Sequence, residues 1–188
     1  QDLPGIYSLS PYTAEEVVSR NYLVNEKPDV ILNIVDASNL ERNLYLTTQL
    51  LEIGVPVVIA LNMMDIIKKN GDHIDTKKLA DMLGCEVVEI SALKGTGIDE
   101  AAKKVVSVAQ KKQKSELKHT FSTGVETALQ QITTIIEGKG DNTGNRWFAV
   151  KIFERDEDIV SKLSFSASEK QQIEEIISCL LYTSPSPR

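Results

Sequence analysis

Three short apolar runs recur in the first half of the chain, and each is followed by a stretch with helical periodicity. They cover residues 30–36, 57–61 and 86–90 and are rich in Val, Ile and Leu. Runs of this kind are typical of parallel strands that are covered on both faces. The alternation of strand and helix predicts an α/β domain with right-handed crossovers, in which 57–61 is the middle strand.

Helix signals fill the segments around these runs. Thr13 with Glu16 and Ser38 with Glu41 have the spacing of capping boxes, in which each side chain binds the other residue's backbone N–H. Apolar residues recur at helical spacing after both boxes. Together with later signals, they predict helices over residues 13–25, 38–53, 75–83 and 98–109.

The character of the chain changes at the segment QKKQKSELK, which is charged and nearly without large apolar residues. We expect a domain boundary there, with a first domain over residues 1–114 and a small all-helical domain over residues 115–180. The prediction of the helical domain depends on apolar residues at helical spacing over 125–136. It also depends on Ser166 and Glu169, a capping-box pattern before a last apolar stripe.

Composition places the chain among globular proteins. Hydrophobic residues make up 41% and charged residues 26%, and no apolar run is long enough to span a bilayer. A net charge of −6 argues against a nucleic-acid partner, because phosphate backbones require an excess of Lys and Arg. Cys85 and Cys179 are the only cysteines, so a reducing compartment is expected. We interpret Cys85 as a small strand residue rather than a metal ligand.

Both ends of the chain carry expectations. Residues 181–188 break the last helical pattern with a stretch rich in Ser and Pro. We expect a non-native tail that resembles translated adapter sequence, with a genuine linker as the alternative. At the other end the chain begins without Met, so we expect the natural N-terminus to lie elsewhere.

Three loops follow apolar segments and together carry the chemistry of a nucleotide site. In the loop 62–65, the Asp65 carboxylate can accept hydrogen bonds from both the ring N–H and the exocyclic amine of guanine. Asn62 can brace the loop and reach the ring nitrogen. Adenine presents different donors and acceptors, and a site built for one pattern can reject another by about 10⁴-fold. The loop therefore predicts recognition of guanine.

The other two loops complete the predicted site. In the loop 91–93, with the sequence Ser-Ala-Leu, a backbone N–H is expected to reach the guanine carbonyl oxygen. In the loop 2–5, Asp2 is expected to hold Mg²⁺ through water, and the Gly5 N–H to meet the terminal phosphate. Each motif alone is common, but their order and their positions after strands make the combination specific.

One part of a guanine-nucleotide site is missing from the sequence, because no G-x-x-x-x-G-K-[ST] phosphate loop occurs in it. The chain begins inside the loop 2–5 instead. We therefore expect part of a P-loop-type GTPase domain, a parallel sheet with flanking helices that lacks its first strands. Residues 30–36 should then form an edge strand, and the chain should bind GTP or GDP weakly and be inactive.

Longer strings around these loops carry a family resemblance. DLPGIYSLSP at residues 2–11, VDASNLERNLYL at 35–46, NMMD and SALKGTG resemble the cytosolic G domain of the FeoB family of ferrous iron transport proteins. The second domain resembles the helical spacer that follows it there. The resemblance implies that GTP or GDP, with Mg²⁺, is bound by Asp2, Leu3, Pro4, Gly5, Asn62, Met63, Met64, Asp65, Ser91, Ala92 and Leu93.

The resemblance also implies a role and a partner. The chain would be the GTP-hydrolysing, regulatory portion of an iron transporter at the cytoplasmic face of the membrane, acting on the transmembrane permease domain of the same parent chain. Met63 stands where a Lys is usual in GTPases, and it can still pack on the nucleotide. Ile6 stands where many GTPases have a water-positioning Gln, so hydrolysis is expected to be slow or differently assisted. No catalytic residue is assigned.

Two other interpretations stay open at this point. A soluble GTPase of ribosome or tRNA maturation carries similar loops, but it normally adds a basic RNA-binding domain, and this chain is acidic. A remnant that no longer binds nucleotide is the other, because the phosphate loop is absent. Measurements of nucleotide binding distinguish the remnant from a regulatory GTPase portion.

Overall fold

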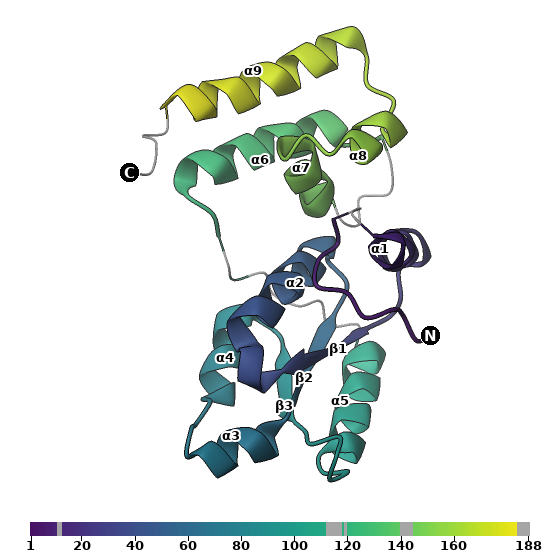
Figure 1. Ribbon diagram of the computed structural model, residues 1–188. Helices are drawn as coiled ribbons and strands as arrows, with labels where there is room; N and C mark the ends of the chain where they lie inside the picture. Colours follow the sequence, from purple (N-terminus) through teal and green to yellow (C-terminus); the bar gives the residue numbers. More distant parts are fainter. Residues whose placement is uncertain (11–12, 112–117, 119, 140–144, 184–188) are drawn as a thin grey trace. The chain divides into compact units, whose positions relative to one another are not determined.

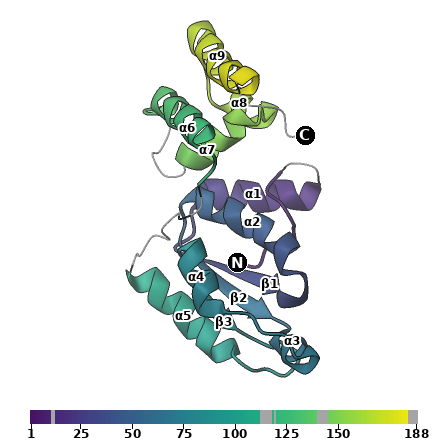
Figure 2. The same cartoon turned by 90° about the vertical axis from the view of Figure 1, so that its left-hand side faces the viewer.

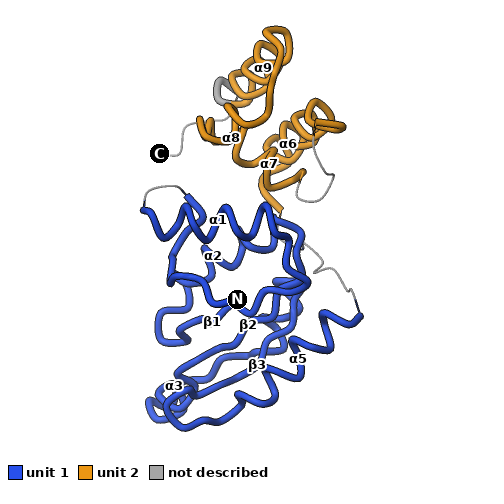
Figure 3. The backbone as a smooth tube through the Cα atoms, turned by 90° about the vertical axis from the view of Figure 1, so that its right-hand side faces the viewer, with its two compact units in different colours: residues 1–119 blue, residues 120–188 orange. Residues whose placement is uncertain are grey.

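The computed structural model describes residues 1–10, 13–111, 118, 120–139 and 145–183. The chain divides into two compact units, residues 1–119 and 120–188, which are coloured separately in Figure 3. The predicted boundary between residues 114 and 115 lies outside the described residues.

The first unit is built on a parallel sheet of three strands (Figure 1). These are β1 (Ile31–Asp36), β2 (Val57–Asn62) and β3 (Glu86–Glu89), and β2 lies in the middle, as predicted. The register pairs Asp36 with Asn62, so β1 and β2 end side by side. Residues 57–61 are all buried, because β2 alone has a strand on each side.

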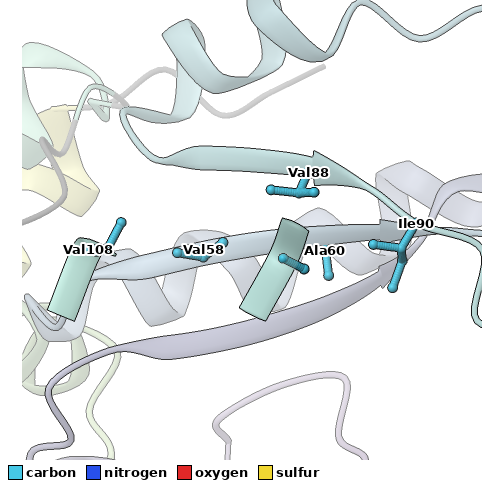
Figure 4. Packing of buried hydrophobic residues seen from close by; sticks show 6 residues of the cluster. Val58, Ala60, Val88, Ile90 and Val108 are labelled. Atoms are coloured by element: carbon cyan, nitrogen blue, oxygen red, sulfur yellow. The ribbon is translucent and has the colours of Figure 1, made fainter. Parts of the chain in front are cut away.

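Helices cover both faces of this sheet, as a parallel sheet requires (Figures 1 and 2). Helix α5 (Ile98–Lys111) packs Ala101 and Val108 against alternate residues of β2 and β3 (Figure 4). On the other face, Asn33 donates a hydrogen bond to Thr47 at 2.9 Å and so links β1 to α2. The remaining helices of the unit are α1 (Ala14–Glu26), α2 (Leu40–Ile53), α3 (Met64–Asn70) and α4 (Thr76–Leu83), with the short η1 (Ala37–Asn39) before α2.

One of the two predicted capping boxes in this unit is correct and the other is wrong. Thr13 and Glu16 form the reciprocal box at the start of α1. The side chain of Ser38 does not cap α2, because the turn η1 begins before it and Asp36 caps that turn. The backbone N–H and the hydroxyl of Ser38 both donate to Asp36, at 2.8 and 2.7 Å. The Ser-x-x-Glu spacing is therefore present, but the N–H and the hydroxyl of Ser38 bind the nearby Asp36 carboxylate instead of forming a capping box.

Strand β1 lies at the edge of the sheet, as expected. In the part of the chain that the structure describes, β1 pairs with β2 alone. Its side chains alternate, so Leu32 and Ile34 are 42% and 62% exposed while Asn33 and Val35 are buried. A cleft of about 430 Å³ lies beside this strand and is lined by residues 1–6 and by α1 and α2.

The second unit is helical in its described residues, as predicted. It consists of α6 (Thr123–Ile136), α7 (Asn145–Phe153), α8 (Glu157–Lys162) and α9 (Ala167–Thr183). Its core takes buried side chains from all four helices, among them Leu129, Ile132, Trp147, Ile152, Ile159 and Ile177. Helix α9 continues to Thr183, past the predicted break at residue 181, and residues 184–188 lie outside the described part. None of the described helices is both long and apolar enough to cross a bilayer.

Ser166 and Glu169 form the predicted capping box at the start of α9. The Ser166 N–H donates to Glu169 at 2.8 Å, and the Glu169 N–H donates to the Ser166 hydroxyl at 3.3 Å. Lys139, which follows α6, lies 2.9 Å from the same carboxylate. The Ser166 N–H first, and then Lys139 and the Ser166 hydroxyl, lower the pKa of Glu169 from 4.5 to about 2.

Glu169→Gln is expected to lower the melting temperature near neutral pH and to matter less in acid. The depressed pKa means that the Glu169 carboxylate contributes stability above pH 4.5, and that this contribution is lost as the pH falls toward 2. Thermal melts at several pH values between 7 and 3 should show the gap between wild type and variant closing. Glu175→Gln, on the exposed side of α9, is the control; a gap that stays constant would contradict the assignment.

Ile34→Lys is expected to reduce self-association of the isolated chain. An apolar strand edge with free N–H and C=O groups can pair with a second copy, and a charged residue opposes that pairing. Sedimentation velocity over a concentration series measures the effect. Met82→Lys is the matched control, because Met82 is 63% exposed but lies on α4 rather than on the strand edge. Equal effects of both changes would show that exposed apolar area, not the edge, drives association.

Candidate functional site

The loop 62–65 and the loop 91–93 meet at the carboxyl ends of β2 and β3. The N–H of Ala92 donates to the side-chain oxygen of Asn62 at 3.0 Å. The N–H of Met64 donates to the Ile90 carbonyl at 3.4 Å, and the Ile90 N–H donates to Leu61 at 2.8 Å. The convergence predicted from the sequence is therefore confirmed, at the edge where open α/β sheets bind ligands.

Asn62 holds a position that the strands determine. It is the last residue of β2, and the carboxyl end of β3 runs beside it in parallel. Its side chain spans the gap between the two loops by accepting from Ala92. Asn62 therefore braces the neighbouring loop 91–93, whereas the sequence predicted that it would brace its own loop.

Met63 turns the chain from β2 into α3, a short helix that the sequence analysis missed. Its φ of 65° lies in the left-handed region, which costs a residue with a Cβ about 1–2 kcal/mol. The N–H groups of Ile66 and Ile67 both donate to the Met63 carbonyl, so the sharp turn leads directly into the helix. As a result, Asp65 lies in the first turn of α3, where a carboxylate is favoured.

Asp65 is held in its ionised form. Its side chain is 17% exposed and lies 3.6 Å from the ammonium group of Lys94. The Ser91 hydroxyl, as a hydrogen-bond donor, and then Lys94 lower the pKa of Asp65 below its usual value. A carboxylate that stays ionised can accept from two N–H groups of a base. Sequence reasoning placed Asp65 and Ser91 in the site but overlooked Lys94.

The loop 91–93 belongs to a tight turn. Ser91 and Thr96 exchange two backbone hydrogen bonds, at 3.0 and 3.2 Å, and Ser91 itself is buried. Leu93 stands at the tip and is 92% exposed. Gly97 follows with a φ of 76°, and a Cβ there would collide with the carbonyl oxygen of Glu89. The close approach of this turn to β3 thus depends on Gly97.

The loop 2–5 lies apart from the other two predicted loops. It lines the cleft beside β1, and the lining of that cleft includes no residue of 62–65 or 91–93. Asp2 and Gly5 are exposed. The structure therefore joins the two loops that are predicted to bind the base, and it leaves the loop predicted to contact Mg²⁺ and phosphate as a separate element.

Tyr7 and Leu9, which follow this loop, both contact side chains of α2. The Leu9 N–H donates to the side chain of Gln49 at 2.7 Å, and the Leu9 side chain is fully buried. The guanidinium group of Arg42 lies 4.0 Å from the centre of the Tyr7 ring. Sequence reasoning did not identify Arg42 or Gln49, because no local pattern indicates which helix a loop will contact.

Candidate metal ligands are sparse. No group of three or more His, Cys, Asp or Glu side chains able to hold a metal ion occurs among the described residues. Burial raises the pKa of the Cys85 thiol to about 12, so it stays protonated at neutral pH and is a poor iron ligand. His73 is exposed, and His119 lies outside the described residues.

Comparisons with known proteins identify the family of the chain. The family model described as "Ferrous iron transport protein B" matches residues 1–105, and the one described as "FeoB cytosolic helical domain" matches residues 121–181. The Fe(2+) transport protein A/Fe(2+) transporter FeoB fusion protein of Porphyromonas gingivalis is 42% identical over 164 residues, 84% of this chain and 19% of that protein. The Fe(2+) transporter FeoB of Legionella pneumophila is 36% identical over 188 residues, 96% of this chain and 25% of that protein.

Solved structures share the fold of the chain. A crystal structure of an S. thermophilus NFeoB mutant bound to GDP has a TM-score of 0.91 and 43% identity, over 97% of this chain and 70% of that one. The mGMPPNP-bound NFeoB from S. thermophilus has a TM-score of 0.89 and 43% identity, over 96% and 68%. The chain thus spans about a fifth to a quarter of the two curated relatives, and about two thirds of these solved chains.

Gly97→Ala is expected to destabilise the first unit more than Gly95→Ala does. Both glycines have positive φ, so each substitution carries the left-handed cost of about 1–2 kcal/mol. Only the Cβ at position 97 meets the Glu89 carbonyl, since space around Gly95 is open. Urea unfolding monitored by circular dichroism measures the difference. Equal losses of stability in both variants would show that the contact with β3 does not matter.

Proposed function

The chain belongs to the FeoB family of ferrous iron transport proteins, and on that premise we propose that its first unit recognises the guanine base of GTP or GDP. The observation that carries the proposal is the pairing of two loops around Asp65 and Asn62. The Ala92 N–H binds Asn62, and the ionised Asp65 carboxylate lies beside the same turn. Relatives whose structures are described as bound to GDP and mGMPPNP support the same assignment.

We propose the following roles for the loops 62–65 and 91–93, here called the base loops. Asp65 accepts from the ring N–H and the exocyclic amine of guanine, and a backbone N–H of the loop 91–93 donates to the guanine carbonyl. Met63 and Met64 shape the entry of α3, and the partly exposed Met63 side chain offers an apolar surface to the ring. An adenine base would leave Asp65 facing the wrong donors, which is the physical basis of selectivity.

The loop 2–5 is assigned to the phosphate end. The residues present fit Mg²⁺, because that ion is held by one or two carboxylates together with waters and nucleotide phosphates, and Asp2 offers an exposed carboxylate. The backbone at Gly5 is unobstructed, with no atom within 4 Å of a Cβ built there, so a phosphate can approach its N–H. When bound, Mg²⁺ would neutralise phosphate charge. Ile6 follows and carries no group that could orient a water.

Binding by this chain should be weak. The sequence has no G-x-x-x-x-G-K-[ST] loop, so a nucleotide would lack those N–H contacts and the Lys. Hydrogen bonds to charged groups contribute roughly 1.5–3 kcal/mol each, and the absence of several lowers affinity by orders of magnitude. We propose base selectivity without tight phosphate binding.

At the level of the whole protein, we propose that both units regulate a ferrous iron transporter. Relatives are named as Fe(2+) transporters, and this chain covers only 19–25% of their length. The partner of these units would be the membrane-spanning remainder of such a protein. A soluble GTPase of ribosome or tRNA maturation is not favoured, because both units match FeoB family models.

Asp65→Asn tests the proposed function. The amide is expected to weaken GDP binding and to favour xanthosine diphosphate, because an amide N–H can face the second carbonyl of xanthine. NMR titrations with GDP, XDP and ADP suit the weak affinities and give three dissociation constants per variant. The GDP preference over ADP should be lost and XDP should bind best. An unchanged order of the three nucleotides would remove Asp65 from the base site, and equal binding of GDP and ADP by the wild type would refute guanine recognition.

A further inference from the structure

The turn over residues 91–96, whose Ala92 binds Asn62, also places the ammonium group of Lys94 beside Asp65. Lys94 lies three residues after Ser91, and its N–H donates to the Ser91 carbonyl at 3.2 Å and to the Ser91 hydroxyl at 3.4 Å. Its ammonium nitrogen lies 3.6 Å from a carboxylate oxygen of Asp65. The same turn therefore presents Ala92 to Asn62 and Lys94 to Asp65.

Lys94 and a guanine base require the same carboxylate. An ionised carboxylate accepts at two oxygens with about four lone-pair positions, and the Ser91 hydroxyl and the backbone N–H of Asp65 already use two of them. Guanine recognition needs both oxygens for two N–H groups that lie in one plane. An ammonium group beside one oxygen competes with that arrangement for space and for lone pairs.

Lys94 and Asp65 differ in burial, and this difference makes the ion pair between them reversible. The Asp65 side chain is 17% exposed, whereas that of Lys94 is 61% exposed and ends a flexible four-carbon stem. An ion pair at 3.6 Å with one partner in water is weak and screened by salt, so the ammonium group can leave without loss of packing. Asp65 is the fixed partner, since it lies in the first turn of α3.

We propose that Lys94 is an internal competitor of the guanine base: its ammonium group covers Asp65 in the empty site and must withdraw when the base binds. The inference rests on the proposed guanine recognition and adds a residue that sets its affinity. Lys94 pairs with the carboxylate while the site is empty. It also re-forms the pair as the base leaves, which favours release.

The opposite role gives the opposite sign. If the Lys94 ammonium group instead lay over the face of the base, or if its charge attracted the phosphates, removing that group would weaken binding. ADP carries the same phosphates as GDP, so the ratio of the ADP to the GDP dissociation constant isolates the contribution of the base. A change in general charge attraction alters both constants and leaves this ratio unchanged.

The test compares Lys94→Met with Lys104→Met in the full chain, by NMR titration with GDP and with ADP. Lys104 is the matched control: it pairs with Glu86 at 3.2 Å, at the other end of β3, and its loss changes the net charge equally. Lys94→Met should raise the ratio about two- to fivefold, the range expected for a partly exposed ion pair. Lys104→Met should leave the ratio unchanged.

The dependence of the same ratio on salt concentration is a second test of the competition between Lys94 and the base. Raising KCl from 0.05 to 0.5 M screens the ion pair, so the wild-type ratio should rise toward that of Lys94→Met, whose own ratio should stay constant. A ratio that falls or does not change in Lys94→Met would overturn the competitor role. A ratio near one in the wild type would refute guanine recognition and, with it, the competitor, whereas a ratio well above one that does not rise in Lys94→Met would refute the competitor alone.

Discussion

The hydrogen bond from the Ala92 N–H to the Asn62 side chain is the interaction on which the candidate site depends. It is possible only because β2 and β3 run parallel and end at the same edge, which brings two loops far apart in sequence into contact. The buried central strand β2 fixes one side of that bond, and Gly97 lets the other side approach β3 closely. The base loops are therefore a consequence of strand order, and the fold need only supply suitable side chains at the strand ends.

The candidate site combines a strained backbone turn and paired charges within a few residues. Met63 adopts a left-handed backbone conformation, and this strained turn places Asp65 at the start of α3. Ser91 and Lys94 then surround the carboxylate with a donor and a cation, which keeps it ionised. Strained backbone and crowded polar groups are common where a protein is organised for binding rather than for stability alone. The second unit differs, because its polar links, such as Arg146 with Glu126 at 2.8 Å, join helix to helix.

Much of the fold, and the convergence of two of the three predicted loops, could be predicted from the sequence. Apolar runs gave all three strands and their order, because a buried parallel strand has a distinctive composition. Two of the three capping boxes, at Thr13 and Ser166, were correct, whereas the third failed because Asp36 offered Ser38 a nearer acceptor. Helix α3 was missed since a strained residue, not a capping residue, begins it. The contact of Lys94 with Asp65 joins separate loops, which no local pattern encodes.

The two ends of a nucleotide place different demands on the chain, and the structure separates them. The base loops lie within one stretch, from β2 to the turn after β3, and they are joined by hydrogen bonds within it. The loop 2–5 lines a different cleft, beside the edge strand β1. Selectivity for a base arises from a fixed pattern of donors and acceptors, so it can be retained where affinity is low. Affinity for phosphates needs many converging N–H groups and cations, which a single short loop does not provide. The proposed base recognition therefore depends only on loops within this stretch, whereas the proposed phosphate binding depends on more groups than the loop 2–5 offers.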